Sequence, residues 1–224
     1  MTSSSRLIVA ISHQMGSGGG YVGQALAGAL GIRYADRDIL EQAALTLGKD
    51  ERDLEGLEER VAGLWGRVAA ILALGAPEAP YVVPSVLSLE EDDLFLVESQ
   101  IIREIASRED AVIVGRGASW LLRDHPGVLT VFLHAPEEWR AAEMMRRRKL
   151  PDVAQALELV RESDQQRRRF IESLRGGTWI DPSCYHLCID TAAVGLDGTV
   201  ELLATLARRR RPAPRDAHPQ RAAS

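Results

Sequence analysis

The stretch IVAISHQMGSGGGYVGQALA, residues 8–27, decides the fold of this chain. A run of apolar and β-branched residues meets a cluster of glycines, and the chain then continues with apolar residues at helical spacing. This pattern predicts a β-strand, a glycine turn and a helix. Such a turn brings backbone N–H groups together at a helix N-terminus, where their partial positive charge favours an anion. We therefore interpret the stretch as a phosphate-binding loop.

Two phosphate-binding motifs compete for this stretch. The spacing Gly18-x-Gly20-x-x-Gly23 matches the dinucleotide fingerprint, and Asp36 lies about 20 residues further on, where that motif places its ribose-binding acid. The rival is the P-loop, Gly-x-x-x-x-Gly-Lys-Ser/Thr. A tight turn that only packs a helix against a sheet is a third explanation.

The match to the P-loop is incomplete. If Gly18 is its second glycine, the first glycine falls on His13 and the lysine falls on Gly19. The hydroxyl positions then fall on Gly20 and Tyr21. The local pattern leaves these alternatives open, so the rest of the chain has to separate them.

Composition and charge limit the classes of protein to which the chain can belong. The 224 residues are 46% hydrophobic and 26% charged, enough for one α/β domain with an insertion. No apolar run is long enough to cross a bilayer, and residues 1–5 lack the apolar region of a secretory signal, so we expect a cytoplasmic protein without a membrane partner. The net charge of −5 argues against nucleic-acid binding. Residues 140–175 nevertheless hold ten Lys and Arg against six acids, which suggests a local anionic ligand.

Strand and helix patterns alternate along the chain. Buried strands are predicted at the start of the stretch above and at residues 32–35, 111–114, 128–133 and 186–190. Helical patterns occupy most of residues 39–74, 88–107 and 140–175, and a last helix covers residues 198–209. The apolar stripe within residues 54–72 would suit a dimer interface as well as a hydrophobic core. Alternating strands and helices predict a parallel sheet covered by helices.

Two further groups of residues are candidates for a site. Arg116 follows the third strand between two glycines, and an arginine at the carboxyl end of a core strand requires an anionic partner, either a ligand or an acid such as Asp36. Cys184, His186 and Cys188 would lie on one face of the last strand. Without other metal-ligand spacing in the chain, we interpret the two cysteines as buried reduced thiols and expect no metal site there.

Taken in order, these motifs resemble the cytidylate kinase-like family, a divergent group of nucleoside monophosphate kinases in the P-loop superfamily. The resemblance spans about residues 6–206 and makes the dinucleotide interpretation the weaker one. The residues that carry it are Ile11-Ser12-x-Gln14-x-Gly16-Ser17-Gly18-Gly19, Tyr34-x-Asp36, Val112 to Gly117, Val131 to Pro136 with Arg140, Asp164-x-x-Arg167 and Ile189-Asp190-Thr191.

The resemblance implies an α/β, three-layer P-loop kinase fold with a five-stranded parallel sheet, a helical insert and a helical lid. The core would comprise residues 1–35, 108–139 and 176–210. Residues 36–107 would form the insert that binds the monophosphate, residues 140–175 the basic lid, and residues 211–224 a disordered tail.

The resemblance also implies the activity and its residues. ATP and Mg²⁺ would be the cofactors, and a nucleoside monophosphate of the CMP type the acceptor. The loop Gly16, Ser17, Gly18, Gly19, Gly20 and Tyr21 would bind ATP. Asp36, Arg37 and Arg116 would bind the acceptor, while Arg116, Arg140, Arg161 and Arg167 would neutralise charge and Asp164 would orient the lid arginines.

Two departures from the family pattern matter. Gly19 replaces the P-loop lysine, and Gly117 replaces the aspartate that follows the arginine in cytidylate kinases. Charge stabilisation at the β- and γ-phosphates must then come from elsewhere, such as a lid arginine. A catalytically weak or silent nucleotide-binding protein on the kinase scaffold is therefore the alternative function.

Overall fold

A computed structural model describes residues 6–36, 91–115, 117–175 and 178–210 of the chain. Its centre is a parallel sheet of five strands in the order β2-β3-β1-β4-β5. The strands are β1 (Ile8–His13), β2 (Arg33–Ala35), β3 (Ala111–Val114), β4 (Val128–His134) and β5 (Leu187–Asp190). The predicted parallel sheet is confirmed, with strand ends that differ from the prediction by a residue or so.

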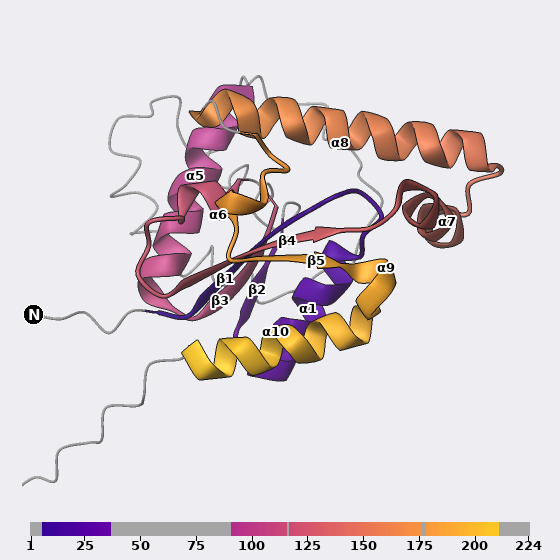
Figure 1. Ribbon diagram of the computed structural model, residues 1–224. Helices are drawn as coiled ribbons and strands as arrows, with labels where there is room; N and C mark the ends of the chain where they lie inside the picture. The colour runs from indigo at the N-terminus through magenta and orange to yellow at the C-terminus, as the bar shows by residue number, and fades with distance from the viewer. Residues whose placement is uncertain (1–5, 37–90, 116, 176–177, 211–224) are drawn as a thin grey trace, which may run out of the picture.

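Helices cover both faces of this sheet (Figure 1). They are α1 (Gly19–Leu30), α5 (Glu91–Arg108), α6 (Ala118–Leu121), α7 (Glu137–Arg148), α8 (Val153–Arg175), α9 (Thr191–Val194) and α10 (Leu196–Arg210). The first residues of the helix predicted at residues 88–107 lie outside the described residues. None of the helices in the described ranges is long and apolar enough to cross a membrane.

The alternation of side chains along β1 explains the three layers. Val9 and Ile11 pack with α1 and α10, whereas Ile8 and Ala10 pack with α5 and α6. Burial of apolar side chains on both faces is typical of a central parallel strand. Gly31 ends α1 in a left-handed conformation, with a φ of 64°, which glycine commonly adopts after the last residue of a helix.

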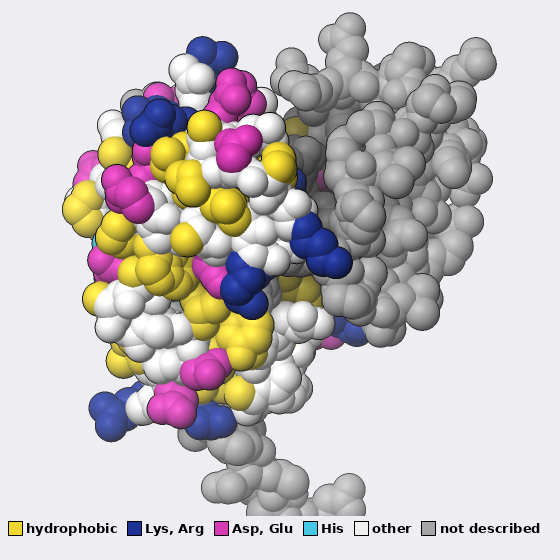
Figure 2. Space-filling model, turned by 90° about the vertical axis from the view of Figure 1, so that its right-hand side faces the viewer, with side chains coloured by type: hydrophobic (Ala, Val, Ile, Leu, Met, Phe, Trp, Pro, Cys, Tyr) yellow, Lys and Arg dark blue, Asp and Glu magenta, His cyan; other side chains and the backbone are white. Residues whose placement is uncertain are grey.

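The basic segment forms a helical hairpin of α7 and α8. Helix α8 crosses above the carboxyl ends of the strands (Figure 1), over an aromatic cluster that includes Phe132, Trp179 and Tyr185. Phe170 of α8 also meets Phe95 of α5 edge to face, with 4.9 Å between the ring centres. The face seen in Figure 2 mixes exposed hydrophobic side chains with charges of both signs.

Candidate functional site

The glycine loop joins β1 to α1 at the carboxyl edge of the sheet, the edge where parallel α/β proteins bind ligands. Gly16 and Gly18 both have a φ of 82°, which side chains disfavour. Gly18 is the N-cap of α1 and provides no side-chain hydrogen bond to the first turn. The N–H groups of Gly19, Gly20 and Tyr21 in that turn therefore keep the geometry of an anion-binding site.

Buried hydroxyl groups fix the base of this loop. The Ser17 hydroxyl donates to the carbonyl oxygen of Gln14 at 2.8 Å and lies 3.2 Å from that of Leu133. Thr191 at the start of α9 donates to the carbonyl oxygen of Ser17 at 2.9 Å. Ser17 was expected to bind ATP, and the structure uses its hydroxyl to tie the loop to β4.

An ion pair from the basic hairpin holds one residue of the loop, Met15, at both its N–H and its carbonyl group. Asp164 of α8 accepts a hydrogen bond from the Met15 N–H at 2.8 Å, and Arg140 of α7 donates to the Met15 carbonyl at 3.0 Å. The two side chains pair with each other at 2.7 Å and are 16% and 5% exposed. Arg140 also donates to the carbonyl oxygen of Ala135 at 2.9 Å, so it is bound on several sides.

The close approach of α7 explains one glycine of the loop. A Cβ atom at Gly16 would lie 2.6 Å from the backbone oxygen of Arg140, which leaves no room for any side chain. The loop and α7 are thus in direct backbone contact. Arg140, predicted to approach phosphates from a lid, instead serves to hold the loop in place.

The other predicted lid arginines differ in their surroundings. Arg161 pairs with Glu137 at 2.6 Å on the surface, where it is 64% exposed. The pairing keeps the pKa of Glu137 below its usual range. Arg167 lies 3.7 Å from Asp164, on the oxygen that also accepts from Met15, so its guanidinium, like that of Arg140, lies near the loop.

His13, the last residue of β1, fills the space above Gly19. A Cβ atom at Gly19 would lie 2.3 Å from the Cγ atom of the His13 ring. Burial and the nearby positive charge of Arg167 lower the pKa of His13 from its ordinary value of 6.5 to about 3. Although part of the residue reaches solvent, its imidazole is therefore neutral at physiological pH.

This lowered pKa predicts a loss of stability in acid. Because the unfolded chain takes up the proton below pH 6.5 and the folded chain only near pH 3, stability falls as the pH drops through this window. Between pH 8 and pH 5 we expect His13 to contribute a loss of about 1–2 kcal/mol. The measurement is urea unfolding at both pH values for the wild type and His13→Phe, since phenylalanine removes the titration. Equal losses in both proteins would contradict the prediction.

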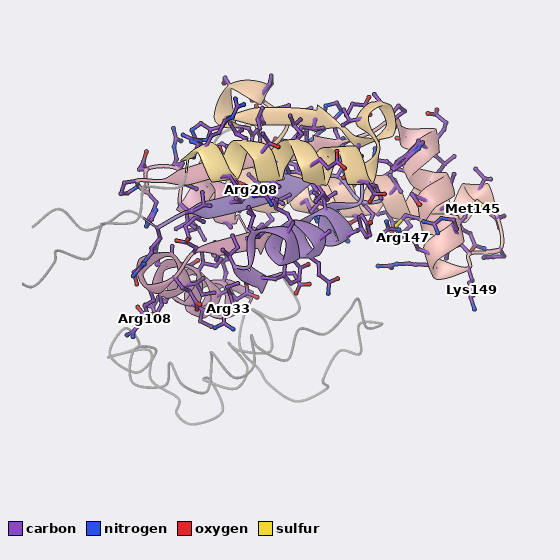
Figure 3. The ribbon with its side chains drawn as sticks, turned by 90° about the horizontal axis from the view of Figure 1, so that it is seen from below. Arg33, Arg108, Met145, Arg147, Lys149 and Arg208 are labelled. Atoms are coloured by element: carbon purple, nitrogen blue, oxygen red, sulfur yellow. The ribbon has the colours of Figure 1, made fainter. Side chains whose placement is uncertain are left out.

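Tyr21 stands at the rim of the loop, on the first turn of α1. Its hydroxyl donates to Asp197 at 2.6 Å, and this hydrogen bond is the main reason why the pKa of Tyr21 is raised. Arg147 opposes that shift through its charge, and Figure 3 shows it reaching from α7 toward the side of the molecule where α1 lies. Tyr21 was expected to bind ATP, and it lies in the first turn of α1, directly after the glycine loop.

Tyr34 links the predicted acceptor residue Asp36 to the glycine loop. The Tyr34 hydroxyl lies 3.0 Å from a carboxylate oxygen of Asp36 and 3.4 Å from the carbonyl oxygen of Gly20. Asp36 therefore faces the loop from the end of β2. The other acceptor candidates, Arg37 and Arg116, lie outside the described residues.

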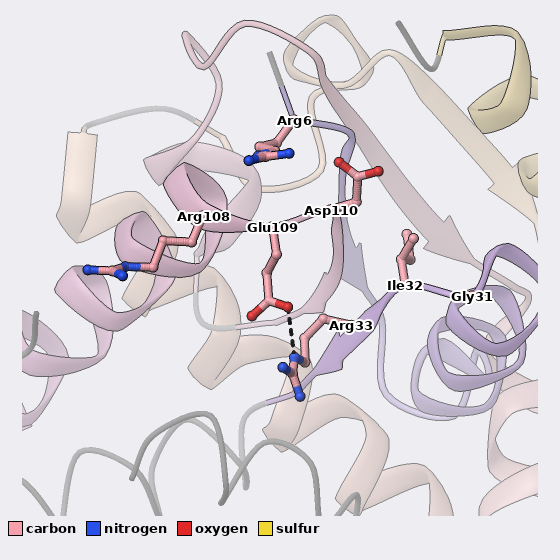
Figure 4. A pocket seen from close by; sticks show the side chains of 7 residues that line it. All are labelled: Arg6, Gly31, Ile32, Arg33, Arg108, Glu109 and Asp110. Atoms are coloured by element: carbon pink, nitrogen blue, oxygen red, sulfur yellow. Dashed lines mark hydrogen bonds and ion pairs between the residues drawn. The ribbon is translucent and has the colours of Figure 1, made fainter. Parts of the chain in front are cut away.

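A second hollow lies at the opposite edge of the sheet (Figure 4) and has a volume of about 500 Å³. It is lined by Arg6, Gly31, Ile32, Arg33, Arg108, Glu109 and Asp110. Arg33 pairs with Glu109 at 3.2 Å, and Asp110 accepts from the N–H of Leu7 at 3.0 Å. Acids thus offset its arginines, and the hollow lies at the amino ends of the strands, away from the glycine loop.

Both cysteines are free thiols, but the prediction that they are buried was wrong. Cys184 ends a short 3₁₀ helix, Pro182–Cys184, and is partly buried, while Cys188 is exposed on β5. His186 lies just before β5, where its Nδ1 is 2.7 Å from the Thr130 hydroxyl. The three residues share no strand face, and no three potential ligands among His, Cys, Asp and Glu converge anywhere in the described ranges.

Sequence reasoning gave no role at the loop to three residues that surround it. His13 was noted only as a replaced glycine, Tyr34 only as a strand residue and a member of a family motif, and Met15 not at all. His13 could have been found, because a bulky residue at a glycine position and a glycine at a lysine position six residues later are complementary in size. Tyr34 and Met15 act through contacts that no local pattern reveals.

Comparisons with known proteins agree with this geometry. The profile of the Cytidylate kinase-like family matches residues 8–193. A cytidylate kinase of Aeropyrum pernix is 35% identical over 107 residues, which are 48% of this chain and 61% of the length of that relative.

Solved structures that resemble this one have low sequence identity to the chain. An uncharacterized protein from Eubacterium ventriosum superimposes with a TM-score of 0.66 at 20% identity, over 91% of this chain and 99% of that one. A shikimate kinase from Bacteroides thetaiotaomicron gives 0.49 at 16% identity, over 90% and 98% of the two chains. The family match covers the glycine loop, the sheet and the basic hairpin together, and the chain therefore belongs to the cytidylate kinase-like family and has its α/β P-loop kinase fold.

Proposed function

We propose that this protein transfers the γ-phosphoryl group of ATP to a nucleoside monophosphate of the CMP type. The observation that carries the proposal is the bond between Asp164 of the basic hairpin and the Met15 N–H of the glycine loop. It joins an anion-binding turn to a helix that carries Arg167. Phosphoryl transfer requires aligned oxygens and neutralised charge rather than a covalent nucleophile, and these two elements supply both.

Each group around the glycine loop has a role in this proposal. The N–H groups of the first turn of α1 bind the phosphates of ATP, and Arg167 neutralises charge that develops during transfer. Arg140 and Asp164 keep the loop in its binding shape. Asp36, together with Arg37 and Arg116, binds the acceptor.

The residues around the glycine loop offer few protein ligands for Mg²⁺. The P-loop positions that usually provide a hydroxyl ligand hold Gly20 and Tyr21, and the Tyr21 hydroxyl is bonded to Asp197. Two carboxylates lie near the loop: Asp164 is occupied by Arg140 and the Met15 N–H, whereas Asp36 accepts from the Tyr34 hydroxyl. Mg²⁺ commonly keeps several waters and binds one or two carboxylates plus phosphate oxygens, so Asp36 would be its protein ligand, directly or through water. When bound, the ion supplies charge neutralisation between the phosphates.

The direct test is an assay of purified protein with ATP, Mg²⁺ and a panel of CMP, dCMP, UMP, AMP and GMP. We expect a diphosphate product, most rapidly from a cytidine monophosphate. No product from any acceptor would refute the kinase. Binding of ATP in a calorimeter without turnover, and no effect of Arg167→Ala on any rate, would favour the alternative of a catalytically silent nucleotide-binding protein. The absence of a lysine at Gly19 is the observation behind that alternative.

The acceptor assignment has its own test. Replacing Arg116 with alanine is expected to weaken binding of CMP about 10- to 100-fold, because a charge-assisted pair with the phosphate is lost. Binding of ATP should be largely unchanged, which provides the internal control in the same calorimetric titrations. Unchanged affinity for CMP would show that Arg116 does not hold the acceptor.

A further inference from the structure

The α7–α8 hairpin has two halves that differ in what they contact. We call residues 137–144 and 161–175 the proximal half, because they include the residues that touch the glycine loop and the sheet. Residues 145–160, which include the turn between the two helices, are the distal half. Figure 1 shows this turn at the end of the hairpin farthest from the strands.

Three hydrogen bonds join the proximal half to the glycine loop and to the residue after β4. Arg140 donates to the carbonyl oxygens of Met15 and Ala135, and Asp164 accepts from the Met15 N–H. The backbone of α7 also touches the loop, since a Cβ atom at Gly16 would lie 2.6 Å from the Arg140 oxygen. Moving α7 away would break hydrogen bonds of charged groups, which are stronger than those between neutral groups.

Apolar contacts fix α8 at a second point. Ile171 is 5% exposed and belongs to the aromatic cluster that includes Phe132 and Trp179. The preceding residue, Phe170, packs edge to face on Phe95 of α5. This point and Asp164 lie about 10 Å apart along the helix. A helix that is fixed at two such points cannot swing about either of them.

The distal half has weaker contacts. Arg146 is 71% exposed and pairs with Glu143 of its own helix. Such exposed pairs contribute little to stability. Val153, at the start of α8, is 55% exposed although it is apolar. The distal half is therefore held less firmly than the proximal half.

We infer that the hairpin does not open and close as a lid. Its proximal half is a fixed wall beside the glycine loop, and movement of the hairpin is confined to the distal half. The glycine loop then has its anion-binding shape before any ligand arrives, so ligand binding does not have to drive closure of α8. This inference concerns conformation and does not depend on the proposed phosphoryl transfer.

Pulsed electron paramagnetic resonance, which measures distances between two spin labels, tests the inference. One label replaces Gln166 of the proximal half or Gln155 of the distal half, and the other replaces Glu201 of α10. All three side chains are exposed, so labels there disturb no packing. Cys184 and Cys188 are first replaced with serine, because both are free thiols that would also take up label.

For the Gln166–Glu201 pair we expect one narrow distance distribution without ligand and a shift of less than about 2 Å with ATP and Mg²⁺. The Gln155–Glu201 distribution should be broader. A second population or a larger shift in the first pair would overturn the inference, and so would equal widths for the two pairs. Failure to bind ATP would refute the proposed function, whereas the distributions without ligand would still decide this inference.

The variant Asp164→Asn tests what fixes α8. It keeps the size of the side chain and removes the charge that pairs with Arg140. We expect the Gln166–Glu201 distribution to become broader than in the wild type. Arg161→Ala, which removes an exposed pair of the same helix, is the matched control and should keep the narrow distribution. Narrow distributions in both variants would show that the buried pair does not hold α8 and would overturn the inference.

Discussion

Replacing Asp164 with alanine is expected to lower the free energy of unfolding by about 3–5 kcal/mol. The Arg140 side chain is only 5% exposed, so the substitution leaves a buried guanidinium without its carboxylate partner. It also removes the acceptor of the Met15 N–H. Removing one member of a buried pair costs more than the pair itself contributes, because the remaining charge cannot be solvated.

Urea unfolding followed by circular dichroism measures this loss. Arg161→Ala is the matched control, because Arg161 lies on the same helix as Asp164 but its pair with Glu137 is on the surface. Such exposed pairs contribute about 1 kcal/mol or less. Asp164→Asn, which keeps an oxygen for Met15 but loses the charge, should fall between the two. If Asp164→Ala were no less stable than Arg161→Ala, the ion pair would not be what holds the loop.

Restoring a lysine at position 19 alone is expected to harm the protein. In Gly19→Lys the new Cβ atom would lie 2.3 Å from the His13 Cγ atom, and Cγ is attached too close to the backbone to move aside freely. Forcing extra atoms into a packed site costs about 1–3 kcal/mol. The double variant His13→Gly/Gly19→Lys places the glycine and the lysine as in the P-loop motif, and most of the penalty should disappear.

A double-mutant cycle of unfolding free energies measures that coupling. The loss caused by Gly19→Lys should be smaller in the His13→Gly background by about 1–3 kcal/mol. The double variant should also bind ATP at least as tightly as the wild type, since an ammonium then reaches the phosphates directly. Additive losses in the cycle would mean that His13 does not exclude a side chain at position 19.

The fold could be predicted because its determinants are local. The apolar runs that form β1, β3 and β4, and the glycine that ends α1, are visible in short windows of sequence. The family motifs then place these elements in a known order. The prediction failed at Cys184 and Cys188, because a 3₁₀ turn at Pro182–Cys184 delays the start of β5 and changes which side chains share a face.

The site was harder to predict because its contacts are long-range. An arginine-rich hairpin suggested phosphate contacts for Arg140 and Arg161 alike, but charge alone does not show which arginine is buried. Packing places Arg140 under the loop and leaves Arg161 with Glu137 at the surface. Arg37 and Arg116 lie outside the described residues, so their roles stay predictions.

The way in which the backbone of Met15 is held has a consequence for protein engineering. Its two partners, Arg140 and Asp164, lie 125 and 149 positions away along the chain. A short strand–turn–helix cassette copied from residues 8–30 into a foreign scaffold would leave both behind. The glycine loop therefore cannot be transferred on its own in its present conformation. A chimera that keeps this conformation must also contain both helices of the hairpin, α7 and α8.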